Sequence, residues 1–242
     1  MIVRKSTAKL IDEGEGARVR RLFPTPDGKV FDPFVLFDEF NFGHPSGFPF
    51  HPHRGFEIIS YVLEGVLHHR DNLGNEGLIK SEGLQKVTAG SGIIHSEYPG
   101  SPESLRGLQL WINLPSKDKQ IEPSYQQLEA KDIPERKWQG GRIRVLCGAN
   151  SPVQLVSSVV LYDVELSEDH IFRCLVEKTF QGIVYVLKGT LQMNGHVAES
   201  GQALFWEAGE NIVVQAATES RFILLAGLPF GETIHINGTF VD

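Results

Sequence analysis

The 242-residue sequence contains two cysteines, Cys147 and Cys174, and their spacing fits neither a metal site nor a redox motif. It contains no apolar stretch near ~20 residues, the length that a membrane-spanning helix requires. Residues 1–5 lack the apolar core and the small-residue cleavage pattern of a signal peptide. These absences predict a cytoplasmic protein with reduced thiols and no membrane partner.

A sustained helical pattern is also missing. The 25 glycines and 13 prolines interrupt the chain about every 8–12 residues, a spacing typical of all-β proteins. The runs between them are short and rich in β-branched and aromatic residues, as at residues 57–63. The net charge of −7 argues against direct nucleic-acid binding, because the chain as a whole repels phosphates. We therefore expect an all-β protein that binds no nucleic acid.

Two short histidine motifs carry the strongest functional signal. They are His51-Pro52-His53 and, after a Gly90-Ser91-Gly92 turn, His95-Ser96-Glu97. In a strand, residues i and i+2 point to the same face, so each pair can reach one point in space. Three imidazoles and a carboxylate that converge inside a β-barrel make a transition-metal site with open positions.

Other residues near these motifs are weaker ligand candidates. Glu57, a few residues after the first pair, is the alternative to Glu97 as the carboxylate ligand. His44, His68 and His69 are better interpreted as surface groups or as groups that orient a ligand.

An internal repeat predicts two copies of one barrel. Residues 61–65 (Tyr-Val-Leu-Glu-Gly) match residues 185–189 (Tyr-Val-Leu-Lys-Gly) at an offset of 124 (185 − 61). Residues 89–93 match residues 208–212 at an offset of 119 (208 − 89), after a shorter loop. A recurring supersecondary unit of this kind indicates a duplicated fold. Under these offsets the four candidate ligands correspond to Leu175, Glu177, Val214 and Ala216.

The repeat and the linker composition predict the domain boundary. Residues 115–123 are polar and bounded by prolines, as expected of a linker, and we place the boundary near Pro134. The predicted domains are residues 1–133, a metal-binding barrel with its linker, and residues 134–242, a barrel without metal ligands.

Several segments resemble the pirin family of the cupin superfamily. They are Phe31–Phe40, Gly47–Pro49, His51–Glu57, Gly90–Glu97 and Gly107–Leu114, with thinner similarity beyond Pro134. The resemblance implies a bicupin, that is, two tandem double-stranded β-helix (jelly-roll) barrels, with one non-haem iron in the N-terminal barrel. Carried over by position, the metal ligands would be His51, His53, His95 and Glu97.

The resemblance implies flavonol chemistry at this metal. Fe(II) is the expected ion, and Ni, Mn, Cu or Zn are alternatives, because imidazole with one carboxylate suits several divalent metals. The implied reaction is quercetin 2,3-dioxygenation, which opens a flavonol with O2 and releases carbon monoxide. Glu97 would serve as ligand and as the base for the 3-hydroxyl proton. Phe42, Phe48 and Phe50 could line an apolar mouth for the flat substrate, with core packing as the alternative.

The resemblance also implies a competing, non-enzymatic class. Some pirins look like iron-dependent, redox-sensing adaptors that bind a transcription factor or a metabolic enzyme. Arg18, Arg20 and Arg21 form the basic cluster placed to serve such a protein partner. Strand alternation puts Arg18 and Arg20 on one face. Intramolecular ion pairs are the simpler interpretation of this cluster.

Overall fold

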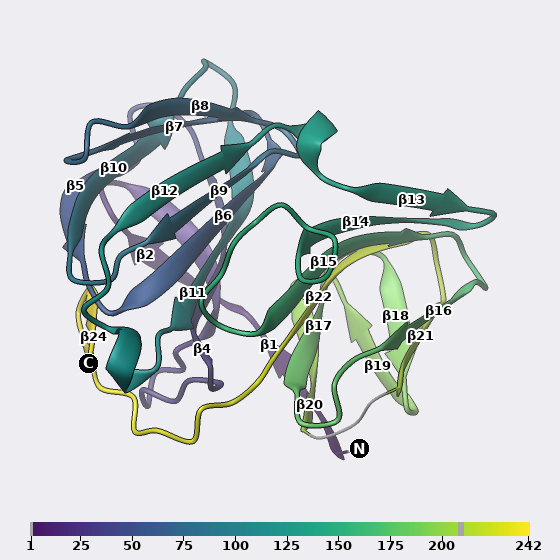
Figure 1. The fold of residues 1–242 in the computed structure, drawn as a ribbon. Helices are drawn as coiled ribbons and strands as arrows, with labels where there is room; N and C mark the ends of the chain where they lie inside the picture. Colours follow the sequence, from purple (N-terminus) through teal and green to yellow (C-terminus); the bar gives the residue numbers. More distant parts are fainter. Residues whose placement is uncertain (1, 208–210) are drawn as a thin grey trace. The chain divides into compact units, whose positions relative to one another are not determined.

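The computed structural model describes residues 2–207 and 211–242, and nearly all of its regular structure is β-strand (Figure 1). This confirms the all-β prediction. The chain divides into two compact units. The N-terminal unit comprises Lys9–Asp132 with Phe230–Asp242, and the C-terminal unit comprises Met1–Ala8 with Ile133–Pro229. Among the described residues, no helix has the length and apolarity needed to cross a membrane.

The N-terminal unit contains a seven-stranded sheet, a four-stranded sheet and a short two-stranded ribbon. The strand orders are β12-β9-β6-β11-β4-β3-β2, β5-β10-β7-β8 and β23-β24. The strands of the larger sheet are β2 (Lys9–Glu13), β3 (Ala17–Phe23), β4 (Phe34–Phe42), β6 (Phe56–Glu64), β9 (Leu84–Thr88), β11 (Leu105–Asn113) and β12 (Ser124–Leu128). The others are β5 (Phe48–His53), β7 (Val66–Asp71), β8 (Glu76–Lys80), β10 (Ile93–Pro99), β23 (Ile236–Asn237) and β24 (Phe240–Val241). Two 3-10 turns complete the unit, η1 (Ser116–Asp118) and η2 (Ala130–Asp132).

The C-terminal unit repeats the pair of larger sheets. Its strand orders are β1-β20-β17-β22-β15-β14-β13 and β16-β21-β18-β19. The strands of the larger sheet are β1 (Ile2–Thr7), β13 (Glu135–Trp138), β14 (Gly141–Cys147), β15 (Val159–Leu166), β17 (Gln181–Lys188), β20 (Gln202–Glu207) and β22 (Ser220–Gly227). The smaller sheet contains β16 (Ile171–Leu175), β18 (Thr190–Met193), β19 (His196–Glu199) and β21 (Asn211–Ala216).

The matching strand orders confirm the predicted duplication. Residues 208–210, which carried part of the predicted repeat, lie outside the described residues. The two larger sheets differ in where one edge strand comes from in the sequence. In the N-terminal unit the edge strand β12 pairs with β9, and in the C-terminal unit the equivalent edge strand is β1, which pairs with β20. The predicted division at residue 133 follows chain order, so it places the N-terminal segment in the first domain and the C-terminal segment in the second. In the structure, strand pairing assigns residues 2–8 to the C-terminal unit and residues 230–242 to the N-terminal unit.

Strand alternation corrects the predicted counterparts of the first histidine pair. Leu175 is 79% exposed and Glu177 lies outside β16, whereas Phe172 and Cys174 alternate toward the inside of that strand. The offset of 124 was taken from β6 and β17, and it does not extend back to β5 and β16. Residues 176–180 separate β16 from β17, whereas only residues 54–55 separate β5 from β6. The inward residues of the C-terminal barrel form one hydrophobic cluster that includes Phe172, Leu191, Met193, Ile212, Val214 and Ala216.

The N-terminal barrel interior has a polar layer between two apolar clusters. Along the inner face of β6, Phe56 and Ile58 belong to one cluster and Val62 belongs to the other. Ser60 lies between them and is fully buried. Because a strand alternates with a period of two, these four residues share one face. The polar layer therefore lies at the level of Ser60.

Gly55, between β5 and β6, packs directly against the C-terminal segment, residues 230–242. The Val241 N–H donates to the Arg54 carbonyl at 3.0 Å, and Arg54 pairs with Asp242 at 2.9 Å. Gly55 adopts φ +87°, and a Cβ at this position would overlap the Val241 carbonyl oxygen. Only glycine meets both requirements.

We expect Gly55→Ala to destabilise the N-terminal unit and to release residues 230–242. Gly74→Ala is the matched control, because Gly74 has φ +89° and a Cβ added there would meet no atom within 4 Å. Both variants carry the backbone strain of about 1–3 kcal/mol, and only Gly55→Ala adds the steric clash. Urea unfolding and limited proteolysis of the C-terminal segment would measure the difference. Equal stability and equal cleavage in the two variants would contradict this assignment.

Candidate metal centre

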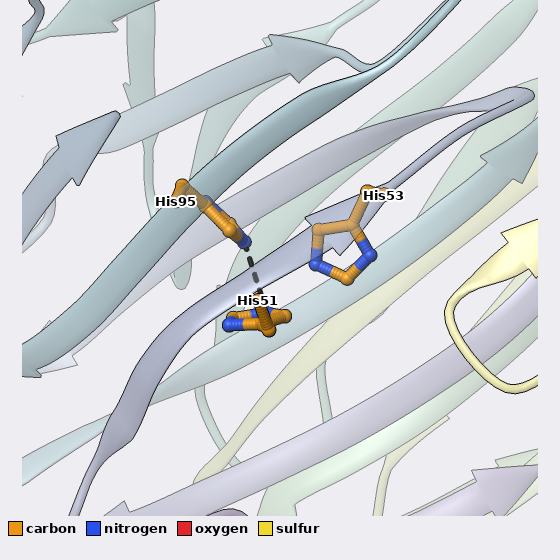
Figure 2. Close-up of side chains that lie close together, drawn as sticks. All are labelled: His51, His53 and His95. Carbon is orange, nitrogen blue, oxygen red and sulfur yellow. Dashed lines mark hydrogen bonds between the residues drawn. The ribbon is translucent and has the colours of Figure 1, made fainter. Parts of the chain in front are cut away.

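Three histidines converge inside the N-terminal barrel from two neighbouring strands. β5 and β10 pair antiparallel, with His51 opposite His95 and His53 opposite Ile93. The ring centroids of His51 and His53 are 4.5 Å apart, and that of His95 is 4.6 Å and 4.8 Å from them. Figure 2 shows the three rings close together, with His51 and His95 facing one another. One nitrogen from each ring lies within 4.8 Å of the others.

The protonation of these rings favours metal binding. His51 Nδ1 lies 2.7 Å from the Pro49 carbonyl oxygen, which can only accept, so the proton is on Nδ1, and the lone pair of Nε2 faces His95 Nε2 at 3.2 Å. Burial and the neighbouring imidazoles lower the pKa of His53 and His95 well below 6.5. His95 Nδ1 is buried and has no hydrogen-bond partner among the described residues. Neutral imidazoles with unused lone pairs fit a divalent transition metal.

Glu97 lies on the same face of β10 as His95 and is held by the opposite sheet. Its carboxylate accepts hydrogen bonds from Gln109 Nε2 at 2.7 Å, from Ser60 Oγ at 3.2 Å and from Gln85 Nε2. In this position a Glu97 oxygen lies within 4.8 Å of one nitrogen of His95 and one of His69. The four predicted ligands therefore fall into two overlapping groups, His51–His53–His95 and His69–His95–Glu97, and the second group includes His69, which was not a predicted ligand.

The side chains that hold Glu97 belong to a polar row across the seven-stranded sheet. Gln85 pairs with Ser60, Ser60 with Gln109, and Gln109 with Asp38 on four consecutive strands. Arg21 pairs with Asp38 on the next strand and contacts its carboxylate at 2.9 Å and 2.7 Å. Strand register thus places five polar side chains at one level of the barrel.

Sequence reasoning missed this row and the position of His69. Ser60 and Gln109 each stand alone in an apolar run, Gln85 is followed by Lys86, and only the pairing of their strands brings the three together. His69 had a usable signal, because His69 and Asp71 repeat the i, i+2 spacing of the first histidine pair. His69 is fully buried, whereas His44 is exposed and His68 is paired with Glu76 at 2.8 Å.

Glu57, the alternative carboxylate, faces away from the polar layer. Glu57 and Ser60 are three residues apart on β6, so their side chains point to opposite faces of the strand. The Glu57 carboxylate contacts Thr88 Oγ1 at 3.1 Å and Lys86 Nζ at 3.5 Å. It belongs to neither of the two candidate metal groups among the described residues.

A cavity of about 540 Å³ within the N-terminal unit opens onto His51 and His53. This volume lies in the range of small-molecule sites. Phe48 lines it, whereas Phe42 packs in a core cluster and Phe50 is 58% exposed. Other lining residues include Arg21, Leu36, Asp38, His51, His53, Gln109, Trp111, Ile236 and Thr239.

The basic cluster on β3 is engaged in intramolecular ion pairs. Arg18 pairs with Asp12 at 3.1 Å, and Arg20 lies 3.6 Å from Glu39. Arg21 pairs with Asp38 and Glu13 at 2.7 Å and 2.8 Å. These contacts match the simpler interpretation of the cluster.

A second cleft, of about 710 Å³, lies on the C-terminal unit. Three of its charged side chains form intramolecular ion pairs: Arg142 with Glu165, Arg221 with Asp163, and Lys188 with Glu219. Both candidate metal groups of the described residues lie in the N-terminal unit, so the 540 Å³ cavity, lined by His51 and His53, is the one next to them.

The two halves of the chain each match a known family model. The model described as Pirin matches residues 16–112, and the Pirin C-terminal cupin domain matches residues 161–242. The chain belongs to the pirin family. Its two barrels are therefore tandem cupin domains, which confirms the predicted bicupin fold.

Pirins from distant organisms match along almost the whole chain. A pirin-like protein of Solanum lycopersicum is 37% identical, with 100% of this chain and 86% of that protein covered. The pirin of Homo sapiens is 39% identical, with 95% and 83% covered. Among solved structures, a quercetin 2,3-dioxygenase from Acinetobacter baumannii is 29% identical and superposes with a TM-score of 0.89, covering 98% of this chain and 90% of that one.

For the metal-free form of this pirin-family protein, we expect the free energy of unfolding to fall as the pH drops below about 6.5. His53 and His95 stay neutral in the folded state, while the same side chains take up protons near pH 6.5 when unfolded. The unfolded state then binds more protons, so stability rises with pH in this window. The slope is about 1.4 kcal/mol per pH unit for each histidine that stays neutral.

Urea unfolding of chelator-treated protein at several pH values between 5 and 7 would measure this slope. The variant His53→Phe/His95→Phe should lose most of it, whereas His44→Phe should keep it because His44 is exposed. An unchanged slope in the double variant would show that other groups cause the acid sensitivity.

Proposed function

We propose that the N-terminal barrel is a metal-dependent dioxygenase centre that opens flavonols such as quercetin and releases carbon monoxide. The observation that carries the proposal is the cavity beside Phe48 and Trp111, which has His51 and His53 among its lining residues. A flat aromatic substrate suits such a wall, because aromatic side chains stack on planar rings. The similarity to a quercetin 2,3-dioxygenase of Acinetobacter baumannii supports the same chemistry.

We propose Fe(II) as the bound metal, with Ni, Mn, Cu and Zn as the alternatives to be tested. His51, His53 and His95 would hold the ion, and Glu97 would be the fourth ligand. A divalent ion there would supply Lewis acidity toward an enolic hydroxyl of the substrate. Imidazole nitrogens with one carboxylate oxygen suit Fe(II), and the absence of a thiolate argues against a closed structural zinc site.

In this proposal Glu97 accepts the proton of the flavonol 3-hydroxyl. Gln109 lines the cavity and donates to Glu97 Oε2 at 2.7 Å. The carboxylate therefore has to exchange its Gln109 hydrogen bond for one from the substrate hydroxyl. Asp38 and Arg21, at the same level of the barrel, offer further polar contacts to the hydroxyl groups of a flavonol.

The overall reaction consumes one flavonol and one O2 and yields one depside and one carbon monoxide. Both atoms of O2 enter the organic product, and one ring carbon leaves with its oxygen as carbon monoxide. No reductant is required for this balance.

The test is reconstitution of metal-free protein under anaerobic conditions with Fe(II), Ni(II), Mn(II), Cu(II) or Zn(II). Each sample is then exposed to air with quercetin, and quercetin loss and carbon monoxide release are measured together. We expect turnover with at least one ion and none in the metal-free protein. One tightly bound ion per chain without carbon monoxide release, for every metal, would refute the dioxygenase proposal.

A further inference from the structure

His69 and Asp71 face the proposed metal centre from the side of β10 opposite to β5. β10 lies between β5 and β7 in the four-stranded sheet, and on β7 Asp71 stands opposite His95 and His69 opposite Glu97. The His69 and Asp71 side chains are fully buried. Both therefore point into the barrel, as His95 and Glu97 do.

The His69 ring is fixed with one nitrogen left unused. Its Nε2 lies 3.1 Å from Asp71 Oδ2, and a carboxylate oxygen only accepts, so Nε2 carries the proton. Asp71 is itself held, because its Oδ1 accepts from the Leu73 and Asn75 N–H groups at 2.9 Å. The His69 ring stacks on Tyr125 with centroids 4.5 Å apart and an angle of 17°. His69 Nδ1 is buried without a hydrogen-bond partner among the described residues.

This arrangement is typical of a metal ligand. A ligating histidine usually donates its second N–H to a carboxylate, which fixes the tautomer and the ring plane. An unpaired nitrogen in a buried site costs free energy unless some group binds there. One nitrogen of His69, one nitrogen of His95 and one oxygen of Glu97 lie within 4.8 Å of one another.

We propose that the barrel has an inner cation position formed by His69, His95 and Glu97, next to the outer position of His51, His53 and His95. Two imidazoles and one carboxylate with open positions are a donor set suited to Fe(II) and related divalent metals. Because His95 belongs to both groups, one ion occupies one position or the other. The inference deepens the proposed function and rests on it only in requiring that the barrel binds a divalent metal.

The C-terminal barrel shows that the fold does not require this pair. There the inward residues of β18, Leu191 and Met193, belong to the hydrophobic cluster of that barrel. A buried His–Asp pair is therefore not needed to close a cupin barrel of this chain.

The experiment measures Co(II) binding, by equilibrium dialysis with metal analysis and by visible absorption under anaerobic conditions. The outer position is removed with His51→Ala/His53→Ala, and His69→Phe or His69→Gln is then added to this double variant. His68→Phe in the same background is the matched control, because His68 is the β7 neighbour that points the other way. Circular dichroism confirms that each variant is folded, and His69→Gln keeps a donor for Asp71.

We expect the double variant to bind one Co(II) per chain and the His68→Phe control to bind it equally well. Either His69 variant should weaken binding by more than about 100-fold, beyond the 10–100-fold typical of a residue that only orients a ligand. Pulsed EPR of the Cu(II)-loaded double variant should detect two coordinated imidazoles, those of His69 and His95.

Three results would overturn the inner position. They are no Co(II) binding by the double variant while the wild type binds, equal binding with and without His69, and one imidazole or none on Cu(II). Failure of the wild-type protein to bind any metal would instead refute the proposed function along with this inference. Binding is measured without turnover, so an inactive but metal-loaded protein leaves the inner position in place.

Discussion

Replacing His95 with alanine is expected to abolish metal binding and all metal-dependent turnover. His95 is fully buried and is the one side chain shared by the two candidate metal groups. Its loss leaves two neutral donors in the outer group, and one imidazole with one carboxylate in the inner group. His51→Ala, by contrast, should lower the affinity and leave a fraction of the bound metal, because His69, His95 and Glu97 remain. Metal analysis after dialysis, for the two variants side by side, would measure the difference.

The fold should survive in both variants. The C-terminal barrel is built from the same strand order with apolar side chains at its inward positions, so the fold does not require imidazoles. His44→Ala serves as the control for a histidine substitution, since His44 is exposed. Unfolding of His95→Ala under conditions where His44→Ala is folded would make the metal structural. Retention of one ion per chain by His95→Ala would show that neither candidate group binds the metal.

Glu97→Gln is expected to reduce flavonol turnover by about 10²–10⁴-fold, the usual contribution of a positioned general base. The amide cannot accept the 3-hydroxyl proton, although its oxygen can still contact a metal. The variant should fold, because Gln85 Oε1 is buried without a hydrogen-bond partner among the described residues. Rotation of the Gln85 amide would let this oxygen accept from the NH2 group that the substitution introduces.

Steady-state kinetics with equal metal content would test the role of Glu97. The loss should appear mainly in kcat, since the wall of the cavity that contacts the substrate is unchanged. Glu57→Gln is the matched control, because Glu57 is equally buried but faces the other side of β6. Unimpaired turnover by Glu97→Gln would exclude the role of general base.

The sequence was most informative where a short local pattern, such as the i, i+2 alternation of side chains along a strand, determines the structure. The i, i+2 spacing of His51 with His53 and of His95 with Glu97 placed each pair on one face, and β5 and β10 bear this out. The duplication was equally visible, because the Tyr-Val-Leu-x-Gly hairpin recurs in β6 and β17. Both signals are read from short runs of consecutive residues, without knowledge of which strands pair.

The sequence was least informative where pairing between distant strands decides the contacts. Gln85, Ser60 and Gln109 form one row only through the registers of β9, β6 and β11, and no local pattern marks them. The counterparts of His51 and His53 were assigned to the wrong face because a longer connection before β17 changes the alternation. A slip in alignment of an odd number of residues turns a buried position into an exposed one.

The exchange of the terminal segments also constrains how this protein is made. β1 leaves the ribosome before the other described strands, yet its partner β20 is synthesised about 200 residues later (202 − 2). Residues 230–242 leave after strands β1–β22 and belong to the unit that carries the candidate histidine ligands. A nascent chain stalled after the linker would hold an unpaired β1 and a first barrel without its C-terminal segment. Such exposed strand edges promote aggregation, so the nascent chain needs protection until residues 230–242 emerge.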